Sequence, residues 1–455
     1  MLQLHLVKEK MEQQEGLNHL IMQVSPQPTE EKQVDRMPHT IVLLIDNSGS
    51  MSETANVGEP ITRSTSQTSA RMSFADQVKK LMRTSSQNTS SPQPLHRQEV
   101  STKLDYVKDA AIALIDQLHD GDSVSVITFS SYADLVQPLI RLTPNSRKAV
   151  KELVRQIQVS GATNISAALE IAKTELAKVD PKHHTRCLLL SDGEANNGIT
   201  EVDEMATFLG DYRKAHWMVS TIGVGVTYNS FFMENIATST GGAFYHLKEM
   251  NQLSDIFQEE LSSLRTATTR HAKLSVTATG GVQVGINLNG YYESEAGQLF
   301  LGNLLYEQDI VVELVTSQTK ESQSQIQVSF TFESDQGLQT ISQTISLPLV
   351  TDDDMDEVNI DLKWAALVEE LMDASIQKNA VKATETRDQK VFSQTQQDSL
   401  HRADRYDQTY SKARKASLKD KTQDLFSSLQ KPENQFGESV KSMYDMSYRT
   451  QRRRK

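Results

Sequence analysis

The sequence predicts an α/β doubly wound (Rossmann-like) domain, an antiparallel β-sandwich domain and a C-terminal helical region. Three observations lead to this prediction. Short apolar strands alternate with amphipathic helices over residues 39–266, which is typical of a parallel sheet covered by helices on both faces. Alternating apolar and polar residues with Gly and Asn turns fill residues 271–349, as in antiparallel sandwiches. Polar sequence with helical periodicity covers residues 358–430.

Length and composition limit the class of protein. The 455 residues include 47 Lys and Arg against 59 Asp and Glu, a net charge of -12, which argues against a protein that coats nucleic acid. Cys187 is the only cysteine, so an intramolecular disulfide and a thiolate zinc module are excluded. We find no apolar run of the roughly 18 to 20 residues that a membrane helix needs and no signal-peptide pattern at the start. We therefore expect a cytoplasmic protein without a membrane span.

The N-terminal segment is expected to belong to the β-sandwich domain. Residues 1–25 contain two alternating stretches, LQLHLVKEK and LNHLIMQVS, separated by a Gln-Gln-Glu-Gly turn, and this period of two predicts two strands. Residues 26–38 contain Pro26, Pro28 and a run of charges, which is typical of a linker. The sandwich would thus be discontinuous in sequence.

The α/β domain is expected to contain five strands with helical segments between them. In a doubly wound sheet, ligands bind beyond the carboxyl ends of the strands, so the loops after the strands are the places to look for a site. The predicted strands are 40–46, 122–130, 185–191, 217–225 and 243–247.

Residues 52–102 interrupt this alternation with a Ser/Thr-rich insertion. Such a composition buries too little apolar surface to offset the entropy of ordering, so we expect the insertion to be largely disordered. Its many hydroxyl residues are possible phosphoacceptors. After residue 430 the sequence is polar, and residues 431–455 end in Gln-Arg-Arg-Arg-Lys. We expect residues 431–455 to form a polar, basic tail whose last five residues (451–455) are solvated, with an anchor for an acidic partner as the alternative.

Oxygen-bearing side chains follow two of the predicted strands and precede one predicted helix. Asp46, Ser48 and Ser50 alternate directly after the first strand, Asp192 follows the strand 185–191, and Thr163 precedes the helix that starts near residue 165. Each has an ordinary alternative role, since Ser and Asp form turns, and Thr163 could cap its helix. If the three loops meet at one edge of the sheet, two carboxylates and three hydroxyls form an all-oxygen set. Such donors suit Mg²⁺, Mn²⁺ or Ca²⁺.

The motifs Asp-Asn-Ser-Gly-Ser-Met (46–51), Gly-Ala-Thr-Asn (161–164) and Ser-Asp-Gly (191–193), in this order, resemble the von Willebrand factor A-type (VWA) domain. The resemblance covers about residues 39–266 and implies a metal-ion-dependent adhesion site (MIDAS). It implies that the metal ligands are Asp46, Ser48, Ser50, Thr163 and Asp192. The whole arrangement also resembles bacterial free-standing VWA-domain proteins. The insertion at 52–102 departs from the family pattern, which passes directly from the first loop into its helix.

The resemblance implies a non-enzymatic protein that binds a protein partner, with the metal accepting a partner's Glu or Asp. An alternative of a different class is an adaptor subunit of an AAA+ ATPase (MoxR-like or chelatase-like) in a remodelling or metal-insertion complex. A metal-dependent hydrolase is a third possibility, for which Glu194 is the nearby candidate for a general base.

Overall fold

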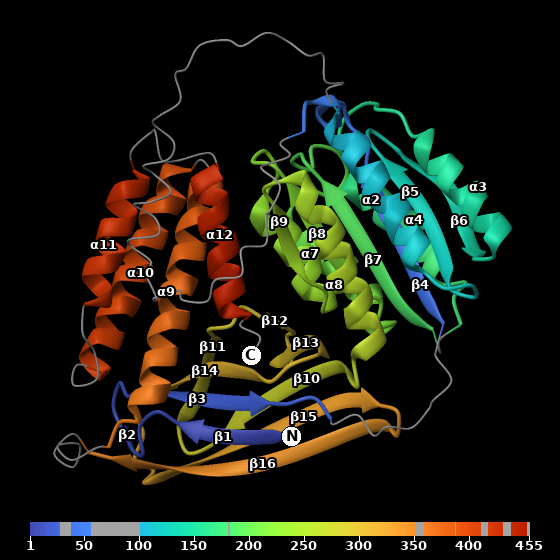
Figure 1. The fold of residues 1–455 in the computed structure, drawn as a ribbon. Coiled ribbons are helices and arrows are strands. Elements are labelled where there is room, and N and C mark those ends of the chain that lie inside the picture. Colours follow the sequence, from blue (N-terminus) through green and yellow to red (C-terminus); the bar gives the residue numbers. More distant parts are fainter. Residues whose placement is uncertain are drawn as a thin grey trace, which may run out of the picture.

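The computed structural model describes residues 1–27, 38–55, 101–180, 183–351, 359–386, 388–410, 417–430 and 438–452. Figure 1 shows three parts: an α/β domain, a β-sandwich beneath it, and a group of helices beside it that also stands on the sandwich. The predicted fold class, a doubly wound α/β domain with a β-sandwich and C-terminal helices, is therefore confirmed.

The sheet of the α/β domain has six strands in the order β6-β5-β4-β7-β8-β9. All pairs are parallel except β5 with β6. The bounds are β4 (His39–Asp46), β5 (Ser123–Phe129), β6 (Ala133–Arg141), β7 (His184–Ser191), β8 (Val219–Val224) and β9 (Phe244–Leu247). The antiparallel strand β6 was not predicted, because it is a half-exposed edge strand that contains Pro138 and lacks an apolar run.

Helices cover both faces of this sheet. Successive residues of a strand point to opposite faces, so in β4 Leu43 packs with one helical layer and Leu44 with the other. The first layer contains α2 (Lys103–Gln117), α3 (Pro144–Arg155) and α8 (Leu253–Thr266), preceded by the short η2 (Met250–Gln252). The second contains α4 (Ile165–Leu176), α5 (Val202–Phe208), α6 (Gly210–Lys214) and α7 (Ser230–Thr240).

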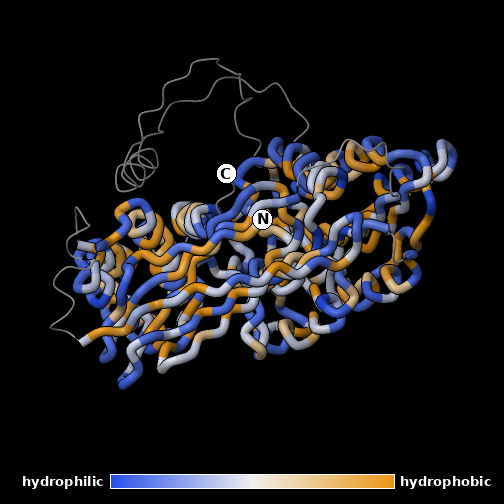
Figure 2. The backbone as a smooth tube through the Cα atoms, turned by 90° about the horizontal axis from the view of Figure 1, so that it is seen from below, coloured by the Kyte–Doolittle hydropathy of each residue, from blue (hydrophilic) through white to orange (hydrophobic). Residues whose placement is uncertain are grey.

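The β-sandwich consists of a four-stranded sheet, β1-β3-β14-β11, and a second sheet, β12-β13-β10-β15-β16-β2. The N-terminal strand β3 lies between β1 and β14, so the first residues of the chain are part of this sandwich. Hydrophobic and hydrophilic residues alternate along its long strands, as Figure 2 shows. The bounds are β1 (Leu2–Leu6), β2 (Met11–Glu12), β3 (Leu17–Val24), β10 (Thr269–Ala278), β11 (Val282–Asn287), β12 (Tyr292–Glu293), β13 (Gln298–Leu304), β14 (Gln308–Thr316), β15 (Gln323–Ser334) and β16 (Gly337–Val350).

The helical region contains α9 (Leu362–Glu385), α10 (Gln389–Thr409), α11 (Leu418–Leu429) and α12 (Glu438–Gln451). The polar, basic tail predicted over residues 431–455 contains a packed helix in its described part, 438–452. The solvated end predicted for residues 451–455 is wrong for Gln451, which is buried. The helix α12 packs against α9 and β9, and Tyr444 and Tyr448 are buried. The cause is an apolar stripe at helical spacing, which buries one side of an otherwise polar segment.

Some predictions fall on residues outside the described part of the chain. The expected disorder and the possible phosphoacceptors of the insertion concern residues 56–100, and most of the predicted linker lies within residues 28–37. The two described ends of the insertion lie side by side, joined by a β-bridge between Thr54 and Thr102. Among the described helices, none has the length and hydrophobicity to cross a membrane.

Candidate metal centre

Asp46 ends β4 at the carboxyl edge of the sheet, and its side chain is fully buried. Its Oδ1 accepts a hydrogen bond of 2.8 Å from the backbone N–H of Ser48, and its Oδ2 accepts one of 2.5 Å from Ser191 Oγ. Burial raises the pKa of Asp46 to about 6; the bonds from Ser191 and Ser48 oppose the shift, and the charge of Asp192 adds to it. A cation beside this carboxylate would offset the cost of keeping it charged without water.

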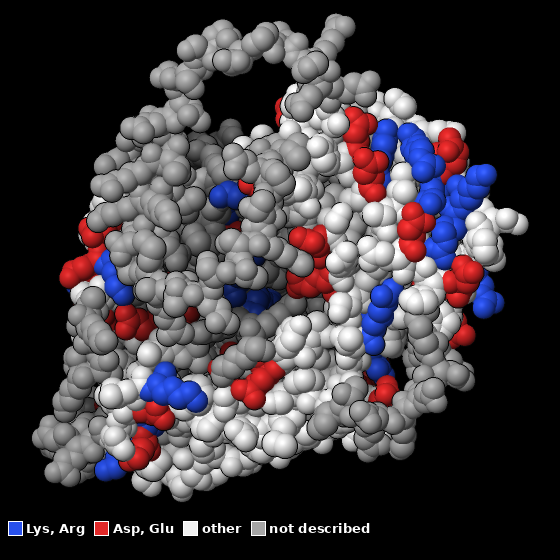
Figure 3. All heavy atoms as spheres, viewed as in Figure 1, with Lys and Arg blue, Asp and Glu red and all other residues white. Residues whose placement is uncertain are grey.

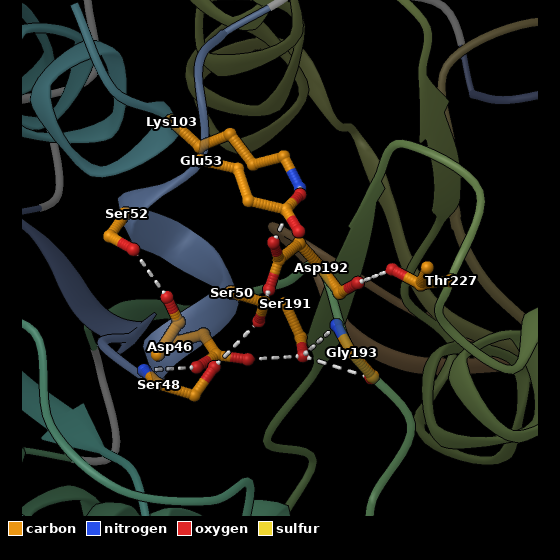
Figure 4. A network of polar contacts seen from close by, with 11 residues as sticks. Asp46, Ser48, Ser50, Ser52, Glu53, Lys103, Ser191, Asp192, Gly193 and Thr227 are labelled. Carbon is orange, nitrogen blue, oxygen red and sulfur yellow. Dashed lines mark hydrogen bonds and ion pairs between the residues drawn. The ribbon is translucent and has the colours of Figure 1, made fainter.

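Ser48 and Ser50 connect the first loop to Asp192. Ser48 begins the turn that leads into η1 (Gly49–Ser52), and its Oγ lies 3.1 Å from Ser50 Oγ. Ser50 Oγ donates a hydrogen bond of 2.6 Å to Asp192 Oδ1. Asp192 follows β7 directly and is fully buried. Figure 4 shows these side chains converging from the two loops.

Thr163 lies beside the same group, and it is not the cap of its helix. The N-cap of α4 is Asn164, whose Oδ1 accepts the bond from Ala167 N–H. A Cβ placed on Gly193 would lie 3.3 Å from Thr163 Oγ1 and 3.9 Å from Ser50 Oγ. The two hydroxyl oxygens are therefore no farther apart than the sum of these distances. Thr163 therefore does not cap α4, and its hydroxyl lies near Gly193 and Ser50.

The loop that carries Thr163 depends on a glycine. Gly161 has a φ of +56°, and a Cβ there would lie 2.5 Å from Ser131 Oγ. Its carbonyl accepts a hydrogen bond of 3.2 Å from the N–H of Gly49. A left-handed conformation without a side chain lets this loop lie directly against the loop of Ser48 and Ser50.

Lys103, Glu53 and Ser191 belong to this polar network but were not predicted as site residues. Lys103 Nζ lies 2.7 Å from Asp192 Oδ2 and 2.6 Å from Glu53 Oε2. Burial disfavours the charge of Lys103, but the bonds and charges of Asp192 and Glu53 outweigh it and raise its pKa. Ser191 stands in the recognised Ser-Asp-Gly motif, which was a usable signal. Lys103 had no such signal, because the insertion separates it from the first loop in sequence.

The donor set at this edge of the sheet fits a hard divalent cation. Within the described ranges there is no group of three His, Cys, Asp or Glu side chains suited to a metal ion. The predicted centre instead combines two buried carboxylates with hydroxyl groups, and oxygen donors of this kind suit Mg²⁺, Mn²⁺ or Ca²⁺.

The other residues singled out in the sequence lie elsewhere or carry no site chemistry. Cys187 is buried in the central strand β7, and burial raises the pKa of its thiol to about 12, so it is a small apolar core residue. Glu194 lies exposed on the loop after Asp192.

Comparison with known proteins identifies the α/β domain. The family model of the von Willebrand factor type A domain matches residues 98–259. The chain is 27% identical over 172 residues to protein sll0103 of Synechocystis sp., and 23% identical over 177 residues to YfbK of Escherichia coli. Each match covers 38% of this chain, and they cover 40% and 30% of the two relatives. The human inter-alpha-trypsin inhibitor heavy chain H4 is 25% identical over 178 residues, or 37% of this chain and 19% of its own length. The chain thus spans less than half the length of these relatives.

Two solved structures share the arrangement of almost the whole chain. The von Willebrand factor type A protein from Catenulispora acidiphila superposes with a TM-score of 0.62 and 14% identity, covering 99% of this chain and 96% of its own. The ArnB paralog VWA2 from Sulfolobus acidocaldarius superposes with a TM-score of 0.53 and 16% identity, covering 98% and 97%. At these identities the likeness concerns the fold alone.

Proposed function

This chain contains a von Willebrand factor type A domain, and on that premise we propose that it is a divalent-cation-dependent protein-binding protein. We propose Mg²⁺ as the ion, with Mn²⁺ or Ca²⁺ as substitutes. The proposed ligands are Asp46, Ser48, Ser50, Thr163 and Asp192. When bound, the ion would supply an electrophilic position for a Glu or Asp carboxylate of the partner.

One observation carries the proposal: two fully buried carboxylates, Asp46 and Asp192, are connected through Ser48 and Ser50. The Ser50 hydroxyl bonds Asp192 and lies beside the Ser48 hydroxyl, and the N–H of Ser48 bonds Asp46. Buried carboxylates are costly unless they are paired, hydrogen-bonded or bound to a metal. Neutral hydroxyls add oxygen donors without adding negative charge. A divalent ion held by this set keeps enough positive charge to attract an external carboxylate.

The chain's own residues would hold the ligands in position. Ser191 Oγ and the N–H of Ser48 each bond one oxygen of Asp46, which fixes the orientation of that carboxylate. Thr227 Oγ1 donates a hydrogen bond to the carbonyl of Asp192 and fixes the loop after β7. Such supporting bonds orient metal ligands in proteins.

A binding role is favoured over hydrolysis and over nucleic-acid binding. Glu194, the candidate general base, is exposed, whereas a buried position is the usual means of raising a catalytic carboxylate's pKa. Over α2 and α3, on the face that Figure 3 shows, blue and red side chains alternate. Two ion pairs of this surface are Arg147–Asp120 and Lys151–Asp116. This part of the surface therefore presents no basic patch.

Metal binding and partner capture test the proposal in two steps. We expect the full chain to bind Mg²⁺ in isothermal titration calorimetry, and D46A to lose this binding while keeping its circular dichroism spectrum. Asp424 is an exposed acid on α11, so D424A is a control with the same change of charge and should bind Mg²⁺ normally. Proteins retained by the immobilised chain with Mg²⁺ should be absent with EDTA and with D46A. Retention that is equal in all three cases would reject the proposal.

A further inference from the structure

Among the described residues, Lys103 is the only lysine that forms an ion pair with a proposed metal ligand, which is Asp192. We propose that Lys103 is a tethered internal cation that competes with the divalent ion for Asp192, so that it raises the metal concentration at which the site fills. This inference rests on the proposed function and adds to it a residue that sets the affinity of the site.

The ammonium of Lys103 is held at the site and is not a mobile surface charge. Its side chain is only 12% exposed, and Nζ is 2.7 Å from the fully buried carboxylate of Asp192. Figure 4 shows the side chain reaching from the start of α2 toward Asp192. A lysine buried to this degree normally needs a fixed anionic partner, and Asp192 is that partner.

The backbone fixes the start of α2 beside the first loop. Lys103 N–H donates a hydrogen bond of 3.0 Å to the carbonyl of Glu53. The preceding residue, Thr102, forms a capping box with Asp105 and a β-bridge with Thr54. Helix capping and strand pairing together define where the Lys103 side chain begins. The position of the ammonium therefore follows from the fold of the insertion's two ends.

Both carboxylate oxygens of Asp192 already have a partner. Ser50 Oγ bonds Oδ1, and Lys103 Nζ bonds Oδ2. A metal ion that binds Asp192 would lie close to the Lys103 ammonium, which is within hydrogen-bond distance of the same carboxylate. Two cations this close repel each other. Glu53 offers the ammonium another position, because its carboxylate is 2.6 Å from Nζ and 64% exposed. Filling of the site would move Lys103 from Asp192 toward Glu53.

Replacing the charge of Lys103 tests the competition directly. We expect K103M to lower the Kd for Mg²⁺ or Mn²⁺, measured by calorimetry with the metal alone, by about tenfold or more, which equals about 1.4 kcal/mol. K103R keeps the charge and should stay close to the wild type. Lys108 lies on the same helix and pairs with Asp105 at 4.0 Å, so K108M removes the same charge away from Asp192 and should leave the Kd unchanged. K103Q repeats the test if K103M folds poorly by circular dichroism.

The outcomes separate this inference from the proposed function. Tighter binding by K103M or K103Q but not by K108M supports it, including the case where only the Lys103 variants bind metal measurably. Equal or weaker binding by the Lys103 variants, with normal wild-type binding, overturns the competition and leaves the proposed function standing. No binding by any of these proteins overturns both.

A double-mutant cycle with Glu53 adds a second, independent test. If Glu53 acts by receiving the ammonium, E53Q should weaken metal binding in the wild type and have much less effect in the K103M background. Residues that act through one another show such non-additivity. An equal effect of E53Q in both backgrounds would mean that Glu53 attracts the ion only through its own charge, and would contradict the proposed movement of Lys103.

Discussion

Removing the buried ammonium of Lys441 should destabilise the contact between α12 and the α/β domain. Its side chain is 7% exposed; Nζ pairs with Glu385 of α9, donates to the carbonyl of Tyr228, and lies 2.9 Å from Ser230 Oγ. Within the described part of the chain, the other carboxylate oxygen of Glu385 has no hydrogen-bond partner. K441M would leave that carboxylate buried without a counter-charge. Breaking one side of a buried ion pair costs about 3 to 5 kcal/mol, and we expect a loss of this size.

The assay is urea unfolding followed by the fluorescence of Trp217 and Trp364, of which Trp364 lies in α9. Replacing both partners by apolar residues is often neutral, so K441M/E385L should recover most of the loss. The exposed pair Lys419–Asp404 is the control, and K419M should leave the midpoint of urea unfolding close to that of the wild type. A wild-type midpoint for K441M, or a double mutant whose loss equals the sum of the single losses, would refute the reasoning.

Three further predictions concern the stability of the fold: two remove a hydrogen bond and one removes a buried histidine. S191A removes the 2.5 Å bond to Asp46 Oδ2. At pH 8 without metal, it should lower the free energy of unfolding in urea by about 1.5 to 3 kcal/mol. An unchanged unfolding midpoint would contradict this. Burial, followed by nearby histidine and arginine charges, lowers the pKa of His271 from 6.5 to about 3. Between these pH values the unfolded chain binds the extra proton, so stability should fall by up to about 1.4 kcal/mol per pH unit as the solution is acidified below 6.5. H271N should flatten this slope, and an identical slope would count against it. Y448F removes the acceptor of the 3.0 Å bond from Phe244 N–H and should lower the free energy of unfolding by about 1 to 3 kcal/mol. K419M is again the control, and its unfolding midpoint should not change.

The α/β fold could be predicted because its central strands are buried on both faces. β4 and β5 have buried side chains at every position, and in β4 this produces a continuous apolar run over residues 41–45 that the sequence displays directly. The edge strand β6 has one half-exposed face and a proline, and it pairs with β5 by tertiary contacts that leave no local pattern. Burial on two faces is visible in sequence, but pairing at an edge is not.

In the candidate centre, too, some residues could be predicted from the sequence and others could not. Asp46 is the last residue of one apolar strand and Asp192 follows another, so the topology of a parallel sheet predicts that they share an edge. Thr163 was ambiguous, because Thr163 and Asn164 are both suitable caps and only the helix start at Ile165 decides between them. Lys103 reaches the centre because the two ends of the insertion pair with each other, a long-range contact without a sequence signature.

The helix α12 shows why a docked segment can be mistaken for a polar tail. Its buried positions follow helical spacing, from Val440 through Tyr444 to Tyr448, but several of them are polar. Tyr444 OH bonds Glu234, and Ser447 Oγ lies 3.0 Å from Gln377 Oε1. A helix that packs between domains can bury polar groups because the neighbouring domain supplies their partners. A polar composition therefore suggests that α12 is exposed, whereas the helical spacing of its buried residues identifies a buried face. The free energy of unfolding that K441M is expected to lose therefore measures how strongly the buried polar face of α12 holds to its neighbours, which composition did not predict.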